Sequence, residues 1–85
     1  MYQHYQEKVH NPRILQRRHR QIARILLSSG DGNPEIAKQI GLSPASINQH
    51  VFELLNWAGA SSRLEFAILV LNSKQKLSEI FEVAA

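Results

Sequence analysis

The sequence predicts an all-α fold, a bundle of four to five helices that contains a helix-turn-helix over residues 33–58. Three observations predict this fold. Apolar residues recur at the three-to-four spacing of buried helix faces, capping residues and turn formers separate the segments, and no convincing strand pattern occurs. With 85 residues, of which 44% are hydrophobic, the chain is long enough for one compact domain with a modest core.

The first helix is expected to begin between Pro12 and Arg17 and to end near Ser29. The polar residues 1–12 before it are interpreted as an arm, and the turn formers of residues 28–32 end the helix. The apolar positions that partly follow the spacing of a buried stripe are Ile14, Leu15, Ile22, Ile25, Leu26 and Leu27.

Two short helices follow, and each has a polar cap before a proline. Asn33 is expected to cap the first, and Gly41 is a natural residue for its end. Ser43 and Pro44 begin the second in the same way, and it should end near Ala58. The expected buried positions of the two helices are Ile36, Ala37, Ile40, Ile47, Val51, Leu54 and Leu55.

Ser61 and Ser62 are expected to cap a further helix, after which one short apolar stripe completes the chain. The predicted division is an arm over residues 1–12, a helix-turn-helix domain over 13–76 and a helical extension over 77–85. The expected buried positions are Leu64, Ala67, Ile68 and Leu71, followed by Leu77, Ile80, Phe81 and Ala84.

The composition argues against several classes of function. The chain has no cysteine, and its four histidines form no metal-ligand pattern, so no metal site is expected. Paired carboxylates and a glycine-rich phosphate loop are missing, and the serines stand at helix starts, so we expect neither an enzyme nor a cofactor. No apolar run approaches the length of a membrane span or a signal peptide, which predicts a cytoplasmic protein without membrane contact.

The charge is distributed unevenly along the chain. Residues 1–30 carry a net charge of +5, whereas residues 31–85 carry −2. A basic block of this kind suggests a phosphate-rich partner, although a solvated basic helix face explains the charge alone equally well.

A helix-turn-helix suits duplex DNA because its tight turn holds the second helix against the first as one unit. A helix in the major groove meets base edges that differ from one base pair to the next. Asn48 and Gln49 can each form a bidentate pair with adenine, and Phe52 can pack on a thymine methyl group. These three residues are the predicted base contacts. Packing of Phe52 on the arm is the alternative.

Three stretches carry a family resemblance. They are residues 35–51 (EIAKQIGLSPASINQHV), Leu15 with residues 18–22 (RHRQI), and residues 59–67 (GASSRLEFA). Over residues 15–72 the chain resembles the DNA-binding domain of the LuxR (GerE, FixJ) type. The resemblance implies a four-helix domain in which the third helix reads DNA and the fourth forms a dimer surface.

The resemblance also implies roles for single residues. It places Asn48, Gln49 and Phe52 at groove contacts, Ser46 at a phosphate contact, and His50 beside the core as a structural residue. Four positions depart from the family pattern. Asn48 and Trp57 stand where the family usually has Lys, Phe52 stands where a polar or basic residue is usual, and Ala58 stands where Leu is usual.

As a result, residues 43–58 contain no Lys or Arg, and this helix alone would bind DNA weakly because phosphate neutralisation dominates affinity. Residues outside the helix are therefore expected to contact the DNA backbone. The arginines at 17, 20 and 24 are expected to share one helix face. Together with Ser46, the predicted backbone contacts are Arg17, Arg18, Arg20, Arg24 and Lys38.

The C-terminal third has more apolar surface than a small monomer readily buries, which predicts a homodimer. The alternative is that these residues complete the monomer core. Trp57 has three possible locations, which are the core, a dimer interface and the DNA surface. The predicted dimer interface consists of Ala67, Ile68, Leu71 and Phe81.

These observations predict a small stand-alone regulator of transcription that binds double-stranded DNA. The alternative function is a protein-binding adaptor or antagonist that pairs with a related regulator through its helical surface and does not itself bind DNA. The uncharged, aromatic-bearing helix at residues 43–58 favours this alternative.

Overall fold

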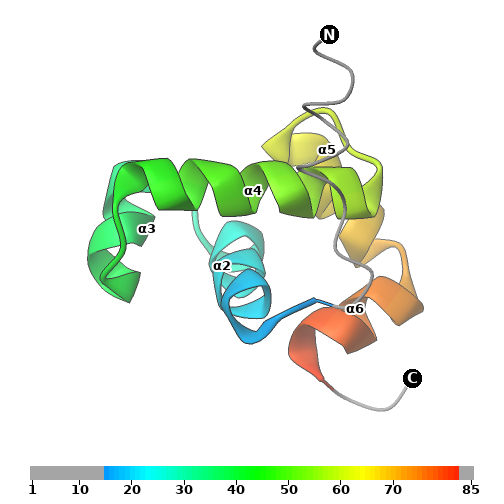
Figure 1. Ribbon diagram of the computed structural model, residues 1–85. Coiled ribbons are helices and arrows are strands. Elements are labelled where there is room, and N and C mark those ends of the chain that lie inside the picture. The colour runs from blue at the N-terminus through cyan, green and yellow to red at the C-terminus, as the bar shows by residue number, and fades with distance from the viewer. Residues whose placement is uncertain (1–14, 83–85) are drawn as a thin grey trace, which may run out of the picture.

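The computed structural model describes residues 15–82, and every regular element in this range is a helix. The helices are α2 (Arg17–Ser28), α3 (Asn33–Ile40), α4 (Pro44–Ala58), α5 (Arg63–Leu71) and α6 (Lys74–Phe81), as Figure 1 shows. The predicted all-α fold is therefore confirmed for this part of the chain. The expected arm at 1–12, Ile14 and Ala84 lie outside the described residues.

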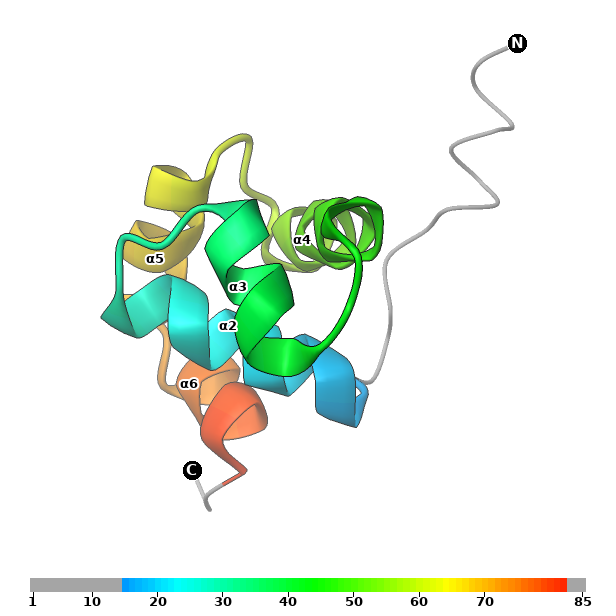
Figure 2. The ribbon, with the colours of Figure 1, turned by 90° about the vertical axis from the view of Figure 1, so that its left-hand side faces the viewer.

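Helix α2 occupies the middle of the fold and contacts α4, α5 and α6. Helix α4, the longest element of residues 15–82, crosses above it and also contacts α3 and α5 (Figure 1). Seen along the axis of α4, α3 lies beside it and α6 lies on the other side of α2 (Figure 2). This arrangement holds α4 from below and from one side and leaves the face opposite α2 uncovered.

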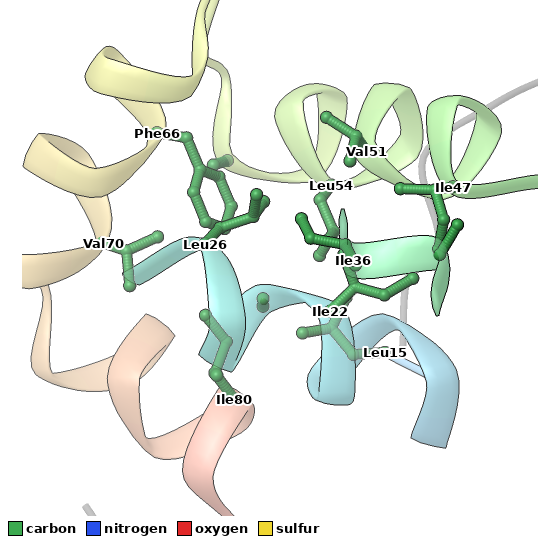
Figure 3. Close-up of a cluster of buried hydrophobic side chains, with 13 residues drawn as sticks. Leu15, Ile22, Leu26, Ile36, Ile47, Val51, Leu54, Phe66, Val70 and Ile80 are labelled. Carbon is green, nitrogen blue, oxygen red and sulfur yellow. The ribbon is translucent and has the colours of Figure 1, made fainter. Parts of the chain in front are cut away.

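One apolar cluster joins all five helices. The largest fully buried side chains come from every element, with Ile22 on α2, Ile36 on α3, Leu54 on α4, Phe66 on α5 and Ile80 on α6. Figure 3 shows these side chains pointing toward one another between the helices. The other members are Leu15, Ala23, Leu26, Ala37, Ile47, Val51, Ala58 and Val70.

Glycines and serines set the ends of the central helices much as the sequence predicts. Gly41 and Gly59 follow α3 and α4 with φ angles of 86° and 75°, in the left-handed region where a side chain is strained. The Ser43 and Ser62 hydroxyls accept hydrogen bonds from backbone N–H groups at the starts of α4 and α5. The predicted cap of α3 is wrong, because Gly32 precedes the helix and Asn33 is its first residue.

The predicted buried face of α5 is also wrong. Phe66 and Val70 enter the core, whereas Leu64, Ile68 and Leu71 are 72%, 50% and 57% exposed. Most positions of α5 are apolar, so spacing alone cannot identify the buried side. The contacts of α5 with α2, α4 and α6 instead select the side that meets the core.

Helix α6 is part of the same core. The predicted division between residues 76 and 77 falls inside α6, whose Ile80 is fully buried against the other helices. Within residues 15–82, none of the helices has both the length and the apolar character needed to cross a bilayer.

Candidate nucleic-acid interface

The uncovered face of α4 displays the three predicted base contacts together. Asn48, Gln49 and Phe52 are exposed, and Phe52 comes four residues after Asn48 and three after Gln49, which places all three on one side of the helix. The opposite side is buried through Ile47, Val51, Leu54 and Ala58. The division of α4 into these two faces follows from the apolar spacing that the sequence shows.

Two of these side chains are held by neighbours. The Asn33 side-chain amide, on the first turn of α3, donates a hydrogen bond to the side-chain oxygen Oδ1 of Asn48. The Gln49 amide donates to Glu53 Oε2 over 3.1 Å, one turn along α4. Phe52 is 38% exposed between these two polar residues.

A buried contact joins Glu53 to α2. His19 is 5% exposed, and its Nε2 lies 2.7 Å from Glu53 Oε1. The Nδ1 atom of the same ring accepts a hydrogen bond from the backbone N–H of Gln16 at 3.4 Å. This accepting role leaves the proton of a neutral ring on Nε2, where it points to the carboxylate. His19 thus ties α4 to the start of α2.

The pKa of the Glu53 carboxyl is lowered in this setting. Burial acts to raise the pKa, but hydrogen bonds from His19 and Gln49 and electrostatic interaction with the His19 and His50 rings outweigh it. The carboxyl therefore has a pKa below its ordinary value of 4.5 and is ionised at neutral pH.

His50 and Ser46 occupy the side of α4 nearer to the core. The His50 ring centroid lies 5.2 Å from that of His19, and its Nδ1 is 2.7 Å from the Ser46 carbonyl oxygen. Ser46 is half-buried in the first turn, where its N–H donates to the Ser43 hydroxyl over 3.1 Å. Ser46 therefore supports the start of α4 as well as standing at the expected phosphate position.

The four predicted arginines of α2 do not form one group. Arg24 donates to the Ile80 carbonyl oxygen from Nε and Nη2, over 3.1 and 2.9 Å, and Nη2 lies 3.2 Å from Glu82. Arg20 Nη2 lies 3.1 Å from the other oxygen of Glu82. These two guanidinium groups hold α6 against α2, so the structure gives them intramolecular partners rather than an open surface.

Arg17 and Arg18 lie at the start of α2 and border a shallow hollow together with Gln16 and Gln21. Arg17 is exposed, and Arg18 is half-exposed with its Nη1 3.3 Å from the Gln21 side-chain oxygen. Lys38 is exposed on α3. Among the predicted backbone contacts within residues 15–82, these three cations face solvent without a carboxylate within ion-pair distance.

The predicted dimer residues differ in their surroundings. Ile68 and Leu71 are exposed on α5 together with Leu64, so these side chains do not complete the monomer core. Ala67 is half-buried. Phe81 is 44% exposed and lies against α2, with the Arg24 guanidinium 5.7 Å from its ring centroid. The apolar face of α5, defined by Leu64, Ile68 and Leu71, is the part of this set that solvent reaches most freely.

Trp57 is half-buried near the end of α4 and packs against the core, with Lys76 Nζ of α6 5.9 Å from its ring. Its surroundings favour a packing role over contact with DNA. Within residues 15–82, no three His, Asp or Glu side chains come together in a group that could hold a metal ion.

Three supporting residues of this surface were not found from the sequence. The linear sequence assigns no role to Glu53, it includes His19 only within the stretch that carries the family resemblance, and it predicts Asn33 only as a helix cap. His19 and Glu53 are 34 residues apart. Their contact depends on how α2 crosses α4, which no local pattern indicates.

Comparison with known proteins found no matching family model, no matching curated protein and no matching solved structure.

Proposed function

We propose that this chain is a sequence-specific DNA-binding regulator of transcription, in which α4 is the recognition helix and enters the major groove. The observation that carries the proposal is the exposed face of α4, where Asn48, Gln49 and Phe52 stand side by side above a fully packed opposite face. Two amides and an apolar ring on one helix face match the hydrogen-bonding groups and the thymine methyl that the major groove presents.

The setting of α4 supports this role. A three-residue turn, Gly41 to Ser43, separates α4 from α3, and both helices pack on each other. The His19–Glu53 contact holds α4 from below. Base readout needs such fixed side chains, because a shift of about 1 Å breaks a bidentate hydrogen-bonded pair. The resemblance of residues 15–72 to LuxR-type domains points the same way.

Most of the affinity must come from outside α4, which carries no Lys or Arg. Arg17, Arg18 and Lys38 are the phosphate contacts of this proposal because they are open to solvent. Arg20 and Arg24, which bind α6, have a smaller part than the sequence suggests. With three such contacts in each chain, the logarithm of the binding constant should fall with the logarithm of salt concentration with a slope of about −3 per bound chain.

A homodimer completes the proposal. Two recognition helices related by a twofold axis would meet two half-sites in successive major grooves. The exposed apolar face of α5 is the surface assigned to this contact. The proposal includes the cytoplasmic location that the sequence predicts.

The test is a fluorescence anisotropy titration of a random-sequence duplex across salt concentrations, followed by selection of bound sequences from a random pool. We expect micromolar binding at low salt and an enriched sequence from the pool. Gln49→Ala should relax the preference at one base pair and leave random-duplex affinity within about twofold. Equal loss on selected and random DNA would remove Gln49 from base reading.

A second candidate function is supported by a different observation. The face of α5 formed by Leu64, Ile68 and Leu71 is exposed and apolar, and α4 has no cation for phosphate. Together these features suit an adaptor that pairs with a related regulator and keeps it from DNA. No binding to any duplex at low salt, combined with self-association or pairing through α5, would favour the adaptor over the DNA-binding role.

A further inference from the structure

A continuous series of polar contacts runs from α2 to the exposed face of α4. The Gln16 backbone N–H donates to His19 Nδ1, and His19 Nε2 lies 2.7 Å from Glu53 Oε1. The second oxygen of the same carboxylate, Oε2, accepts a hydrogen bond from Gln49 Nε2 over 3.1 Å. The series thus begins at the start of α2 and ends at a predicted base contact.

The chemistry of this series fixes the direction of the Gln49 amide. An ionised carboxylate can only accept hydrogen bonds, so Gln49 has to turn its NH₂ group toward Glu53. The amide is planar, and its carbonyl oxygen Oε1 is therefore directed away from Glu53. Hydrogen bonds from His19 and Gln49 help to keep the pKa of Glu53 below its ordinary value, so the carboxylate is present at neutral pH.

The carboxylate itself has little freedom to turn. His19 is 5% exposed on α2 and holds Oε1, while the Glu53 side chain is only 23% exposed. The other ring near this carboxylate, His50, presents its Nδ1 to the Ser46 carbonyl oxygen instead. Glu53 therefore offers Gln49 one fixed acceptor.

We infer that Glu53 is a positioning residue that holds Gln49 with its carbonyl oxygen outward, so that Gln49 selects a base with an amino group in the major groove. This inference rests on the proposed function. Adenine fits best, since its N6 amino group donates to Oε1 and its N7 accepts the second hydrogen of Nε2. Cytosine offers an amino donor alone, and guanine and thymine present acceptors to an outward carbonyl oxygen.

The variant Glu53→Gln tests the inference. An amide at position 53 can donate or accept, so it no longer dictates which end of the Gln49 amide faces outward. The matched control is Glu79→Gln, which removes the same charge from a half-buried position on α6. Both variants raise the net charge equally, so any general gain in DNA affinity is shared between them.

The measurement uses four duplexes that differ only at the base pair where Gln49→Ala flattens the preference. We expect the wild-type chain and Glu79→Gln to bind the adenine duplex roughly tenfold more tightly than the guanine duplex. In Glu53→Gln this ratio should fall to about threefold or less, since a reversed amide accommodates guanine. Random-duplex affinity of the two variants should agree within about twofold.

A second measurement needs no substitution, which guards against loss of folding in Glu53→Gln. In the free wild-type chain, the NMR signals of the Gln49 side-chain NH₂ should shift as acid protonates Glu53, with a midpoint below 4.5. Gln21 on α2, whose side-chain oxygen accepts from Arg18, serves as the reference and should show no such shift.

The outcomes separate the two claims. Three results would overturn the positioning role of Glu53 and leave the proposed function unaffected. They are a preference of the wild-type chain for guanine or thymine, an unchanged ratio of adenine-duplex to guanine-duplex affinity in Glu53→Gln, and Gln49 NH₂ signals that do not shift when Glu53 is protonated. Failure to bind any duplex overturns the proposed function and this inference with it.

Discussion

Arg17 and Arg24 lie two turns apart on α2 and carry the same charge, but their surroundings differ. Arg24 donates two hydrogen bonds to the Ile80 carbonyl oxygen and pairs with Glu82, whereas Arg17 is exposed to solvent. We therefore expect Arg24→Ala to lower the stability of the fold and Arg17→Ala to lower DNA affinity. Each variant serves as the charge-matched control for the other.

The size of the stability effect follows from the contacts of Arg24. Hydrogen bonds from a charged donor contribute about 1.5 to 3 kcal/mol when they are well shielded. The Arg24 side chain is 40% exposed, and the Glu82 side chain 56%, so solvent screening reduces both contributions. A loss of about 1 to 2 kcal/mol in the free energy of unfolding remains, which lowers Tm by roughly 5 to 15 °C in a domain of this size.

Thermal denaturation followed by circular dichroism measures the first effect, and anisotropy titrations across salt measure the second. Arg17→Ala should leave the unfolding free energy within about 0.5 kcal/mol of the wild type. Its salt slope should decrease in magnitude by about 0.9 per bound chain, because each chain loses one phosphate contact. Arg24→Lys keeps the charge but lacks the forked donor, so it should recover only part of the lost stability.

A reversed pattern would refute this reasoning. If Arg24→Ala kept the Tm of the wild type and decreased the magnitude of the salt slope, Arg24 would be a DNA contact. The attachment of α6 to the core would then depend on Ile80 alone. If both variants changed only stability, the proposed phosphate contact of Arg17 would be wrong.

Three further predictions concern the core, the α5 face and acid stability. Phe66→Ala should lower the unfolding free energy by about 3 to 5 kcal/mol in denaturant titrations, whereas Leu64→Ala, at a 72% exposed position, should change it by under about 0.5 kcal/mol. Ile68→Glu should abolish self-association in sedimentation and keep the Tm of the wild type at concentrations where both chains are monomeric, and a dimer that persists would place the interface elsewhere. The pKa of Glu53 in the folded chain lies below 4.5, so the ionised carboxylate contributes fully to the free energy of unfolding above that pH. This contribution is lost as the pH falls through the folded pKa. If Glu53→Gln left the acid denaturation profile unchanged, this expectation would be wrong.

The positions of the helices follow closely from local signals in the sequence. Gly41 and Gly59 end their helices in left-handed conformations, and Ser43 caps α4 through its hydroxyl. These features depend on residues within a few positions of one another, so a linear pattern contains them. The buried stripe of α4 is equally readable, because polar residues clearly mark its other side.

The orientation of α5 and the partners of the charged residues could not be read in the same way. Helix α5 has apolar residues nearly all round, so only its attachment to the core selects Phe66 as the inward position. Arg24 meets Ile80 across 56 residues of sequence, and His19 meets Glu53 across 34. Such contacts arise from how the helices cross. They determine which arginines are exposed to solvent and which acceptor the Gln49 amide on α4 meets.

Arg20 has a consequence for the connectivity of the fold. Its guanidinium donates to the Leu15 carbonyl oxygen and lies 3.1 Å from Glu82, so it bridges the first and last residues that the structure describes. A short linker should therefore connect residues 82 and 15 without disturbing the core. Circular permutation is tolerated at exposed turns, and the turn at Gly30 after α2 is exposed. A permuted chain opened at Gly30 should fold to the same helix arrangement, with α3 first and α2 last.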